Sequence, residues 1–357
     1  MKRVLLTGAF GNVGANALAQ LCDQGYETFA FDVPTVRNQK WAKRLSRSFR
    51  FRVIWGDLRS VDSVSQAVDQ ARPEAILHLA AVIAPTAYVI PEVAYDVNVN
   101  GTRNLLAVAK AQSSPPTVVF TSSYSVHGPR NPYRSLPPLT AESPLDPADN
   151  YGRHKAAGEQ MVQSSGLPWT IIRLSTVMAT AKDWGQSKEF FKIAFLLPLD
   201  RREHAIDSRD AGLALANAID NERALNRVFV IGGPEENCRI TGHDFFGGVG
   251  QARGISFPPS AFRIADPDVD ESWYYEDWVD TTESQEILGY QRHSFPGYLA
   301  HLRQQTRFSR PVLKLLRPLV HRQVVKESPY YGKEQVASRE SFWSVACQTF
   351  GLDPDQR

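Results

Sequence analysis

The chain has 357 residues, of which 43% are hydrophobic and 22% are charged, which is the composition of a globular protein with a large core. Its formal net charge of +2 gives no reason to expect a nucleic-acid partner, and no apolar run approaches the ~18 residues of a membrane-spanning helix. Its 3 cysteines, Cys22, Cys238 and Cys347, lie far apart and lack metal-site spacing, which favours a reducing, cytoplasmic compartment and no metal ion.

Strands and helices alternate along the first half of the chain. Short apolar runs predict strands at 3–7, 27–32, 51–55, 75–79, 117–121 and 169–174, and helical periodicity predicts helices at 13–21, 61–71, 91–111 and 151–163. This alternation predicts a Rossmann-type α/β fold, a doubly wound parallel sheet with helices on both faces. Ligands of such sheets bind at the carboxyl ends of the strands.

Beyond residue 174 the pattern is less regular. We expect a helix at 187–197, a helix that Asp210 caps and that ends at Ile219, and a strand at 227–231. The aromatic and acidic segment 273–278 would line a substrate cleft or form a packed edge, and these readings are about equally favoured. The basic, apolar segment 310–322 favours a docking or oligomer contact over a membrane surface, because it is short and contains two prolines.

A glycine-rich turn at 7–14 joins the first strand to the first helix. Glycines let the backbone approach a pyrophosphate, and the helix N-terminus presents free N–H groups to it. A turn without a ligand is the alternative, which the position between strand and helix disfavours. Asp32 ends the second strand, where an acid accepts hydrogen bonds from ribose hydroxyls and repels a 2′-phosphate. NAD is therefore favoured over NADP, although Arg37 and Lys40 nearby oppose this preference.

Tyr151 and Lys155 stand one helical turn apart in the helix predicted at 151–163. A phenol is a poor base, with an ordinary pKa of about 10, but a nearby ammonium stabilises the phenolate and moves that pKa toward neutrality. The pair suits proton exchange in an alcohol/ketone interconversion. A chance surface pair is the alternative, which the order of the motifs disfavours.

These two motifs and four others follow one another along the chain. They are Thr7-Gly8-x-x-Gly11-x-x-Gly14, Gly56-Asp57-Leu58, His78-Leu79-Ala80-Ala81, Asn98-Val99-Asn100-Gly101-Thr102, the serine-rich segment 121–128 and Tyr151-x-x-x-Lys155. With these motifs the chain resembles the extended short-chain dehydrogenase/reductase family, the NAD-dependent epimerase/dehydratase group. The resemblance implies that NAD is bound by Gly8, Phe10, Gly11, Asn12, Val13, Gly14, Asp32, Asp57, Leu58, Leu79, Ala80, Ala81, Tyr151 and Lys155.

The resemblance also implies catalytic roles. Ser123 would orient the substrate oxygen, and Tyr151 would exchange the proton. Lys155 would lower the Tyr151 pKa and hold the nicotinamide ribose. Asn98 would bend its helix and support a water near Lys155. Ser122 is the rival of Ser123 and is expected to point away from the site.

Two positions depart from the family pattern. His127 stands where the family usually has tyrosine, and we expect it in the pocket wall together with Tyr124. Thr176 replaces the asparagine that meets the diphosphate of a nucleotide sugar, which favours a small non-nucleotide substrate. Substrate contacts are thus expected from Ser123, Tyr124, His127 and Thr176.

These observations predict an NAD-binding domain at 1–174 to which 205–231 returns, a substrate-binding region at 175–204 and 232–306, and a C-terminal extension at 307–357. We expect an NAD-dependent oxidoreductase that transfers a hydride at a secondary alcohol or ketone. A nucleotide-sugar epimerase or dehydratase with the same serine, tyrosine and lysine is the alternative. A non-catalytic NAD-binding regulator is less favoured, because it needs no proton relay. The resemblance implies a homodimer through helices 91–111 and 151–163.

Overall fold

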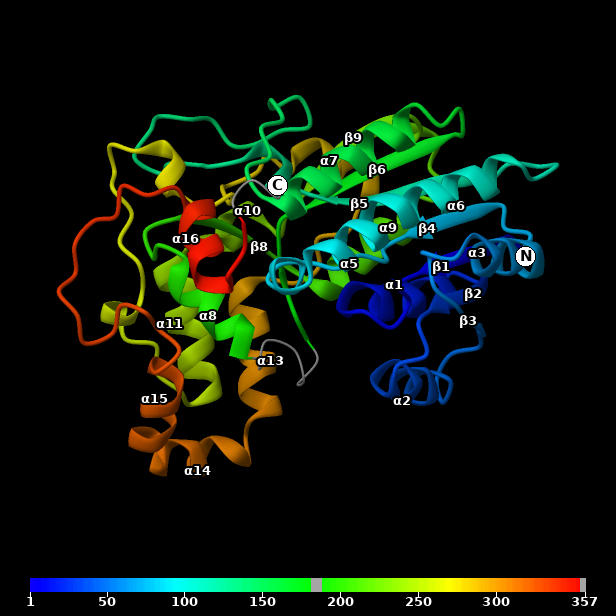
Figure 1. Ribbon diagram of the computed structural model, residues 1–357. Coiled ribbons are helices and arrows are strands. Elements are labelled where there is room, and N and C mark those ends of the chain that lie inside the picture. Colours follow the sequence, from blue (N-terminus) through cyan, green and yellow to red (C-terminus); the bar gives the residue numbers. More distant parts are fainter. Residues whose placement is uncertain (181–187, 354–357) are drawn as a thin grey trace.

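The computed structural model describes residues 1–180 and 188–353, and a seven-stranded parallel sheet forms its centre (Figure 1). The strand order is β3-β2-β1-β4-β5-β6-β9. The strands are β1 Arg3–Thr7, β2 Glu27–Asp32, β3 Arg52–Trp55, β4 Ala75–His78, β5 Thr117–Ser123, β6 Trp169–Leu174 and β9 Arg227–Ile231. Every neighbouring pair is parallel, which confirms the predicted Rossmann-type fold.

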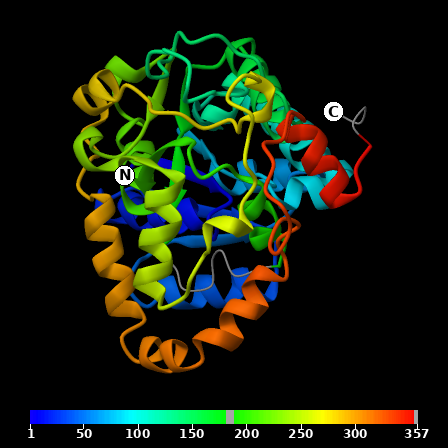
Figure 2. The same ribbon diagram turned by 90° about the vertical axis from the view of Figure 1, so that its left-hand side faces the viewer.

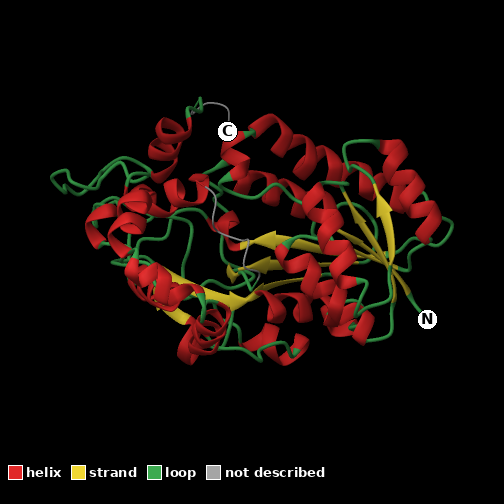
Figure 3. Cartoon of the chain, turned by 90° about the horizontal axis from the view of Figure 1, so that it is seen from below, coloured by secondary structure: helices red, strands yellow, loops and turns green. Residues whose placement is uncertain are grey.

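Helices cover both faces of this sheet (Figure 3). One core joins the sheet to α1 Asn12–Asp23, α2 Val36–Leu45, α9 Ser208–Asn217 and α12 Thr282–Leu288. The other joins it to α3 Val61–Ala71, α6 Gly101–Lys110 and α7 Asn150–Gln163. Buried aliphatic residues dominate both cores, and their burial supplies the main driving force for this layered arrangement.

A second lobe lies beyond one end of the sheet (Figure 1), and it faces the viewer in Figure 2. It contains a small sheet in the order β10-β8-β7, made of β7 Thr176–Met178, β8 Arg202–Asp207 and β10 Arg239–Thr241. Its helices are α8 Lys188–Leu196, α10 Glu235–Cys238, α11 Gly242–Arg253, α13 Phe295–Gln305, α14 Ser309–Leu315, α15 Arg317–Val325 and α16 Phe342–Phe350. The helix expected at 187–197 is α8, and Ser187 lies outside the described residues.

The long helix expected at 91–111 is interrupted. It consists of α5 Pro91–Tyr95, a π-helical stretch η1 at Asp96–Asn100 and then α6, with the short helix α4 Thr86–Val89 before it. Short 3-10 turns occur at η2 Tyr124–His127, η3 Glu222–Ala224, η4 Pro259–Ala261 and η5 Asp270–Ser272. Within the described ranges, no helix combines the length and the apolar character needed to cross a membrane.

The predicted cap of the helix ending near Ile219 is wrong. Asp207, not Asp210, caps α9, because its carboxylate accepts a hydrogen bond from the Arg209 N–H at 2.9 Å. The Asp210 carboxylate instead accepts from the N–H groups of Arg292 and His293, at 2.9 and 2.8 Å. Asp210 therefore ties the segment before α13 to the first turn of α9.

Candidate active site

The turn between β1 and α1 brings the backbone close to neighbouring strand ends. Gly8 has a φ of 68°, and a Cβ atom there would lie 2.7 Å from the backbone nitrogen of Ala80. A Cβ at Gly14 would lie 2.0 Å from the carbonyl oxygen of Gly8. Only glycine fits these positions, so the turn keeps an open cradle at the N-terminus of α1.

One further feature beside this turn suits an anion. A cavity of about 710 Å³ opens beside Gly11 and Asn12, and its described lining includes the cations Lys40, Arg44 and Arg209 but no carboxylate. The residues of the turn therefore fit the diphosphate of a dinucleotide.

Asp32 lies beside this turn at the end of β2. Its carboxylate accepts hydrogen bonds from the N–H groups of Phe10 at 2.9 Å and Val33 at 2.8 Å, and from the Asn38 side chain at 3.0 Å. Burial raises the pKa of Asp32, while these N–H groups and the charge of Arg37 act in the opposite direction. The structure thus brings Asp32 to the phosphate turn, as the sequence predicted.

The other expected cofactor residues line the same edge of the sheet. The N–H groups of Leu79 and Ala80 each donate to the Thr7 hydroxyl at 3.2 Å, which places the end of β4 against the end of β1. Leu58, the neighbour of Asp57 in the chain, is buried in the core cluster against which Ala80 packs. The side chain of Arg59 binds the Asp57 carboxylate and holds the pKa of Asp57 below its usual range.

Ser123, Tyr151 and Lys155 meet where β5 ends and α7 begins. Asp149 caps α7 by accepting from the Gly152 N–H at 2.7 Å, which fixes the first turn of the helix. The ammonium nitrogen of Lys155 lies 6.0 Å from the centroid of the Tyr151 ring. The Ser123 side chain is hydrogen-bonded to the Tyr151 phenol, and this bond lowers the pKa of Tyr151. The predicted alcohol-binding residues are therefore neighbours in space.

The protonation of this pair differs from the expectation. Burial and the negative charge of Asp149 raise the pKa of Tyr151 above its ordinary value, and the hydrogen bond with Ser123 only partly opposes this shift. Burial lowers the pKa of Lys155 to about 8. Lys155 donates to the carbonyl oxygen of Thr121 at 2.7 Å, so its ammonium is directed toward β5 rather than the phenol. In this arrangement Tyr151 is a proton donor.

Asn98 lies within the π-helical stretch η1, where we expected a local bend. Its side-chain amide donates to the Val82 carbonyl at 2.9 Å and accepts from the Val82 N–H at 2.8 Å. This paired contact joins η1 to the segment that follows β4. The Ser122 hydroxyl donates to Glu159 of α7 at 2.5 Å, so it is bound within the interface between β5 and α7.

His127 serves the packing of the site. Its Nδ1 atom contacts the Pro144 carbonyl at 2.9 Å, and its Nε2 atom lies 3.4 Å from Arg173. Burial lowers the pKa of His127 to about 4, so the imidazole is neutral near pH 7. Both ring nitrogens face protein groups, which leaves the expected substrate contact of His127 without support.

Tyr124 and Thr176 form one polar cluster with residues from the second lobe. Their hydroxyl groups are hydrogen-bonded, and the Thr176 hydroxyl lies 3.3 Å from Glu276. Arg201 binds Glu276 at 2.6 Å and Glu203 at 2.5 Å, and all three side chains are buried. Sequence reasoning missed this buried cluster, although it had marked the segment 273–278 that contains Glu276.

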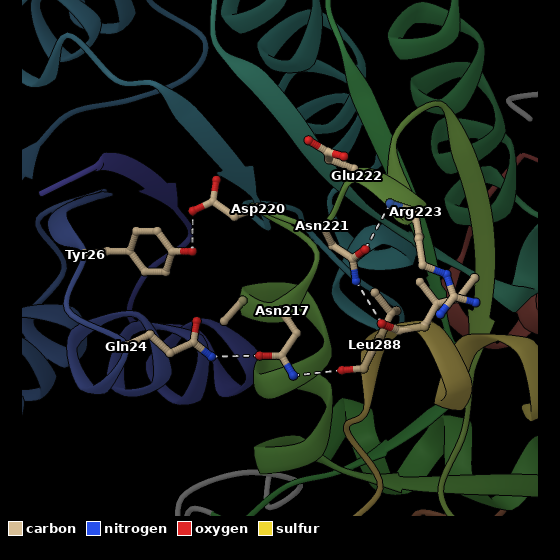
Figure 4. A pocket seen from close by; sticks show the side chains of 10 residues that line it. Gln24, Tyr26, Asn217, Asp220, Asn221, Glu222, Arg223 and Leu288 are labelled. Carbon is tan, nitrogen blue, oxygen red and sulfur yellow. Dashed lines mark hydrogen bonds between the residues drawn. The ribbon is translucent and has the colours of Figure 1, made fainter.

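A separate hollow of about 620 Å³ lies at the edge of the sheet opposite the candidate active site (Figure 4). Tyr26 and Asp220, which precede β2 and β9, line it, and the Tyr26 hydroxyl donates to the Asp220 carboxylate at 2.8 Å. Gln24 and Asn217 form a second pair there at 2.7 Å. This hollow is at the amino ends of the strands and contains none of the residues expected to bind NAD or substrate.

Comparisons with known proteins point to one family. A model of the NAD dependent epimerase/dehydratase family matches residues 4–192. UDP-glucose 4-epimerase 2 of Oryza sativa subsp. japonica is 32% identical over 186 residues, which is 49% of this chain and 44% of that protein. D-erythronate dehydrogenase of Cupriavidus necator is 30% identical over 185 residues, 49% of this chain and 55% of that protein. The chain thus spans about half the length of these curated relatives.

Solved structures show the same fold. The UDP-glucose-4-epimerase of Stenotrophomonas maltophila, crystallised with bound NAD and formylated UDP-arabinopyranose, superposes with a TM-score of 0.68 at 18% identity. The match covers 87% of this chain and 100% of that chain. It therefore extends the likeness in fold beyond the first half of the sequence into the second lobe.

Proposed function

Because this chain belongs to the NAD-dependent epimerase/dehydratase family, we propose that it is an oxidoreductase acting on a secondary alcohol or ketone of a small, non-nucleotide substrate. The cofactor of the family is NAD, which supplies the hydride acceptor or donor when it is bound. The observation that carries the proposal is the meeting of Ser123, Tyr151 and Lys155 at the carboxyl edge of the sheet, beside the phosphate turn.

Each of these residues has a defined task. The Ser123 hydroxyl orients the substrate oxygen by a hydrogen bond. Tyr151 gives its phenolic proton to that oxygen when a ketone is reduced, and takes the proton back when an alcohol is oxidised. The ammonium of Lys155 lies 6.0 Å from the Tyr151 ring centroid, and its positive charge favours the phenolate that forms on proton transfer. Asn98 shapes the helix that faces them through its contact with Val82.

The cofactor would lie along the edge of the sheet. Its diphosphate fits the turn of Gly8, Phe10, Gly11, Asn12, Val13 and Gly14, and its adenosine ribose fits Asp32. Asp57 and Leu58 would meet the adenine, and Leu79, Ala80 and Ala81 would line the path toward Tyr151. The open cradle at Gly8 and Gly14 supports this placement.

The non-nucleotide part of the proposal rests on the cluster around Thr176. The site at this position presents a hydroxyl backed by the Glu276 carboxylate, which repels a diphosphate. The arginines of this region are engaged within the protein: Arg201 with Glu203 and Glu276, Arg209 with Asp207, and Arg263 with the carbonyl oxygens of Ser272 and Glu340. The similarity to D-erythronate dehydrogenase is consistent with a hydroxy-acid substrate.

A nucleotide-sugar epimerase is the second candidate, because the relative of 32% identity is a UDP-glucose 4-epimerase. An epimerase returns the hydride to the same substrate, so it retains its cofactor and accumulates no NADH. Denaturing the purified protein and identifying the released nucleotide distinguishes the two. We expect little retained NAD and net NADH formation with a hydroxy compound. Stoichiometric retained NAD, together with conversion of UDP-glucose and no NADH, would favour the epimerase.

We further propose the domain organisation predicted above, in which 1–174 and 205–231 bind NAD, 175–204 and 232–306 bind the substrate, and 307–357 form a C-terminal extension. Residues 181–187 and 354–357 lie outside the part of the chain that the structure describes. We propose a cytoplasmic homodimer that pairs through α5, α6 and α7. The exposed apolar residues Val89, Ile90, Val93 and Tyr95 at the start of this surface support the pairing. Light scattering of the purified protein tests it.

A further inference from the structure

Two hydrogen bonds fasten the short helix α4 to the start of α7. The Tyr88 hydroxyl donates to one carboxylate oxygen of Asp149. The Asn150 side chain donates to the Ala87 carbonyl at 2.9 Å. Tyr88, Asp149 and Asn150 are all buried, at 0%, 1% and 2% exposure, so neither bond competes with bulk water.

The C-terminal helix α16 holds Tyr88 in this position. The Tyr88 ring packs edge-on against Trp343, with centroids 5.5 Å apart, and lies 5.8 Å from the Phe350 ring. Residues of α16, Tyr88 and the neighbouring Tyr275 belong to one buried cluster. Such aromatic pairs add stability beyond their buried area. The extension at the end of the chain therefore reaches the start of the helix that carries Tyr151 through Tyr88 and its carboxylate partner.

Asp149 stands two residues before Tyr151 and acts on it in two ways. One carboxylate oxygen caps the first turn of α7 through the Gly152 N–H, and the other accepts from Tyr88. The buried negative charge also stabilises the neutral phenol of Tyr151. The other titratable groups that face this carboxylate are Tyr274 and Tyr275 from the second lobe and Arg153 from α7.

We propose that Asp149 is a positioning residue for Tyr151, held in place by Tyr88 and the C-terminal helix α16, and that its charge keeps the phenol in the proton-donating form. The proposal rests on the proposed function, in which Tyr151 exchanges the proton. It gives the C-terminal extension a role in the active site. It also assigns Tyr88 a role that no sequence motif marks.

The first test separates charge from capping. Asn is as good a helix cap as Asp, so Asp149→Asn keeps the acceptor for the Gly152 N–H and removes the charge. It also replaces the oxygen that accepts from Tyr88 by an NH2 group, which can donate to the Tyr88 oxygen instead. The full-length protein, labelled with ¹³Cζ-tyrosine and saturated with NAD, is titrated by NMR from about pH 7 to the highest pH at which it stays folded, because the pKa of Tyr151 lies above its ordinary value of about 10. The Tyr151 resonance is assigned by its loss in Tyr151→Phe. Asp207→Asn, at the cap of α9, is the matched control.

We expect the Tyr151 resonance of Asp149→Asn to titrate lower than that of the wild type by about one pH unit or more. We expect no such shift in Asp207→Asn. Coincident titrations of wild type and Asp149→Asn would overturn the proposal. This readout needs no substrate. An inactive Tyr151→Phe with coincident titrations would reject the role of Asp149 and leave the proposed function standing, whereas an active Tyr151→Phe would reject the proposed function itself.

The second test examines the link to α16 and does not depend on Asp149→Asn folding. Tyr88→Phe removes one hydroxyl and keeps the ring, and Trp343→Ala removes the ring that packs on Tyr88. Hydrogen exchange of the Gly152 amide reports the cap directly. We expect exchange to be at least about tenfold faster in both variants, and restored toward wild type in Trp343→Phe. Leu319→Ala, on the exposed surface of α15, is the control. Unchanged exchange in Tyr88→Phe and Trp343→Ala would overturn the link.

Discussion

Lys155 donates a hydrogen bond to the carbonyl oxygen of Thr121 at 2.7 Å, across the interface between α7 and β5. The side chain is only 4% exposed, and its ammonium also lies 5.1 Å from the Phe120 ring centroid. Burial disfavours the charge, although the negative charge of Glu159 acts in its favour. The position therefore costs stability at neutral pH.

Replacing Lys155 by Met should stabilise the fold while abolishing activity. The folded pKa of about 8 lies below the unfolded value, so the folded state binds this proton less tightly. The free-energy cost of burying the charged lysine is full below pH 8, and it fades as the pH rises toward about 10.5. We expect Lys155→Met to raise the unfolding free energy at pH 7 by up to about 3 kcal/mol, less about 1 kcal/mol for the lost hydrogen bond.

Urea unfolding at pH 7 and at about pH 10 measures this effect. The gain should shrink at the higher pH, where the wild-type lysine is neutral in the folded state. Lys110→Met, at an exposed position of α6, should change little at either pH. A Lys155→Met protein that is less stable than the wild type at pH 7 would show that the ammonium is not buried at a cost.

The carboxylate of Asp32 should set the choice of cofactor. Asp32→Asn keeps an acceptor for the Phe10 and Val33 N–H groups and removes the charge that would repel a 2′-phosphate. We expect the preference for NADH over NADPH to narrow by about tenfold, or 1.4 kcal/mol. Isothermal titration of both cofactors measures it, with the exposed Asp23→Asn as control. If wild-type protein bound NADPH as tightly as NADH, Arg37 or Lys40 would override the acid.

The substrate should be small and free of a diphosphate. A thermal-shift screen with NAD present compares UDP-glucose and dTDP-glucose with free hydroxy acids and their keto forms. A diphosphate needs several charge-assisted donors to offset its desolvation, and the cluster at Thr176 offers a carboxylate instead. We expect a hydroxy or keto compound to raise the melting temperature more. Clear stabilisation by a nucleotide sugar but not by its free sugar would reverse the assignment.

The ion pair of Arg173 and Glu159 beneath the site should be a major source of stability. Two hydrogen bonds of 2.9 and 2.8 Å join the side chains, which are 4% and 2% exposed. Arg173→Leu leaves Glu159 buried without its partner, and we expect a loss of about 3–5 kcal/mol in urea unfolding. Arg223→Leu, which breaks an exposed pair with Glu286, should cost at most about 1 kcal/mol. Equal losses in the two variants would refute this expectation.

The sheet and its carboxyl edge were predictable, because each strand is a short apolar run and each glycine turn follows one. The helix α2 was missed because its apolar stripe is short: Trp41, Ala42 and Leu45 pack against the core, and Asn38 is the other residue buried there. The break in the helix at 91–111 was foreseen only at Asn98, and the π-helical stretch there depends on the distant contact with Val82.

The site was predictable where its residues belong to local motifs. Asp149 was missed as a partner of Tyr151 because its role depends on Tyr88 and α16, which are far away in the sequence. The cluster of Tyr124, Thr176 and Glu276 likewise unites three separate segments. Such contacts are set by the tertiary packing of distant segments and cannot be read from the spacing of residues in the sequence. The pKa of Tyr151 also required the fold, because burial and Asp149 outweigh the expected effect of Lys155.

Net hydride transfer in wild type and Tyr151→Phe tests the central claim most directly. Purified protein is given NAD and a panel of secondary alcohols and hydroxy acids, and NADH formation is followed by absorbance. Calorimetry confirms that the variant still binds NAD. The account predicts NADH well in excess of enzyme with at least one non-nucleotide compound, and a fall of about 10²-fold or more in Tyr151→Phe. Near wild-type turnover in Tyr151→Phe, or conversion of UDP-glucose without net NADH as the sole activity, would contradict it.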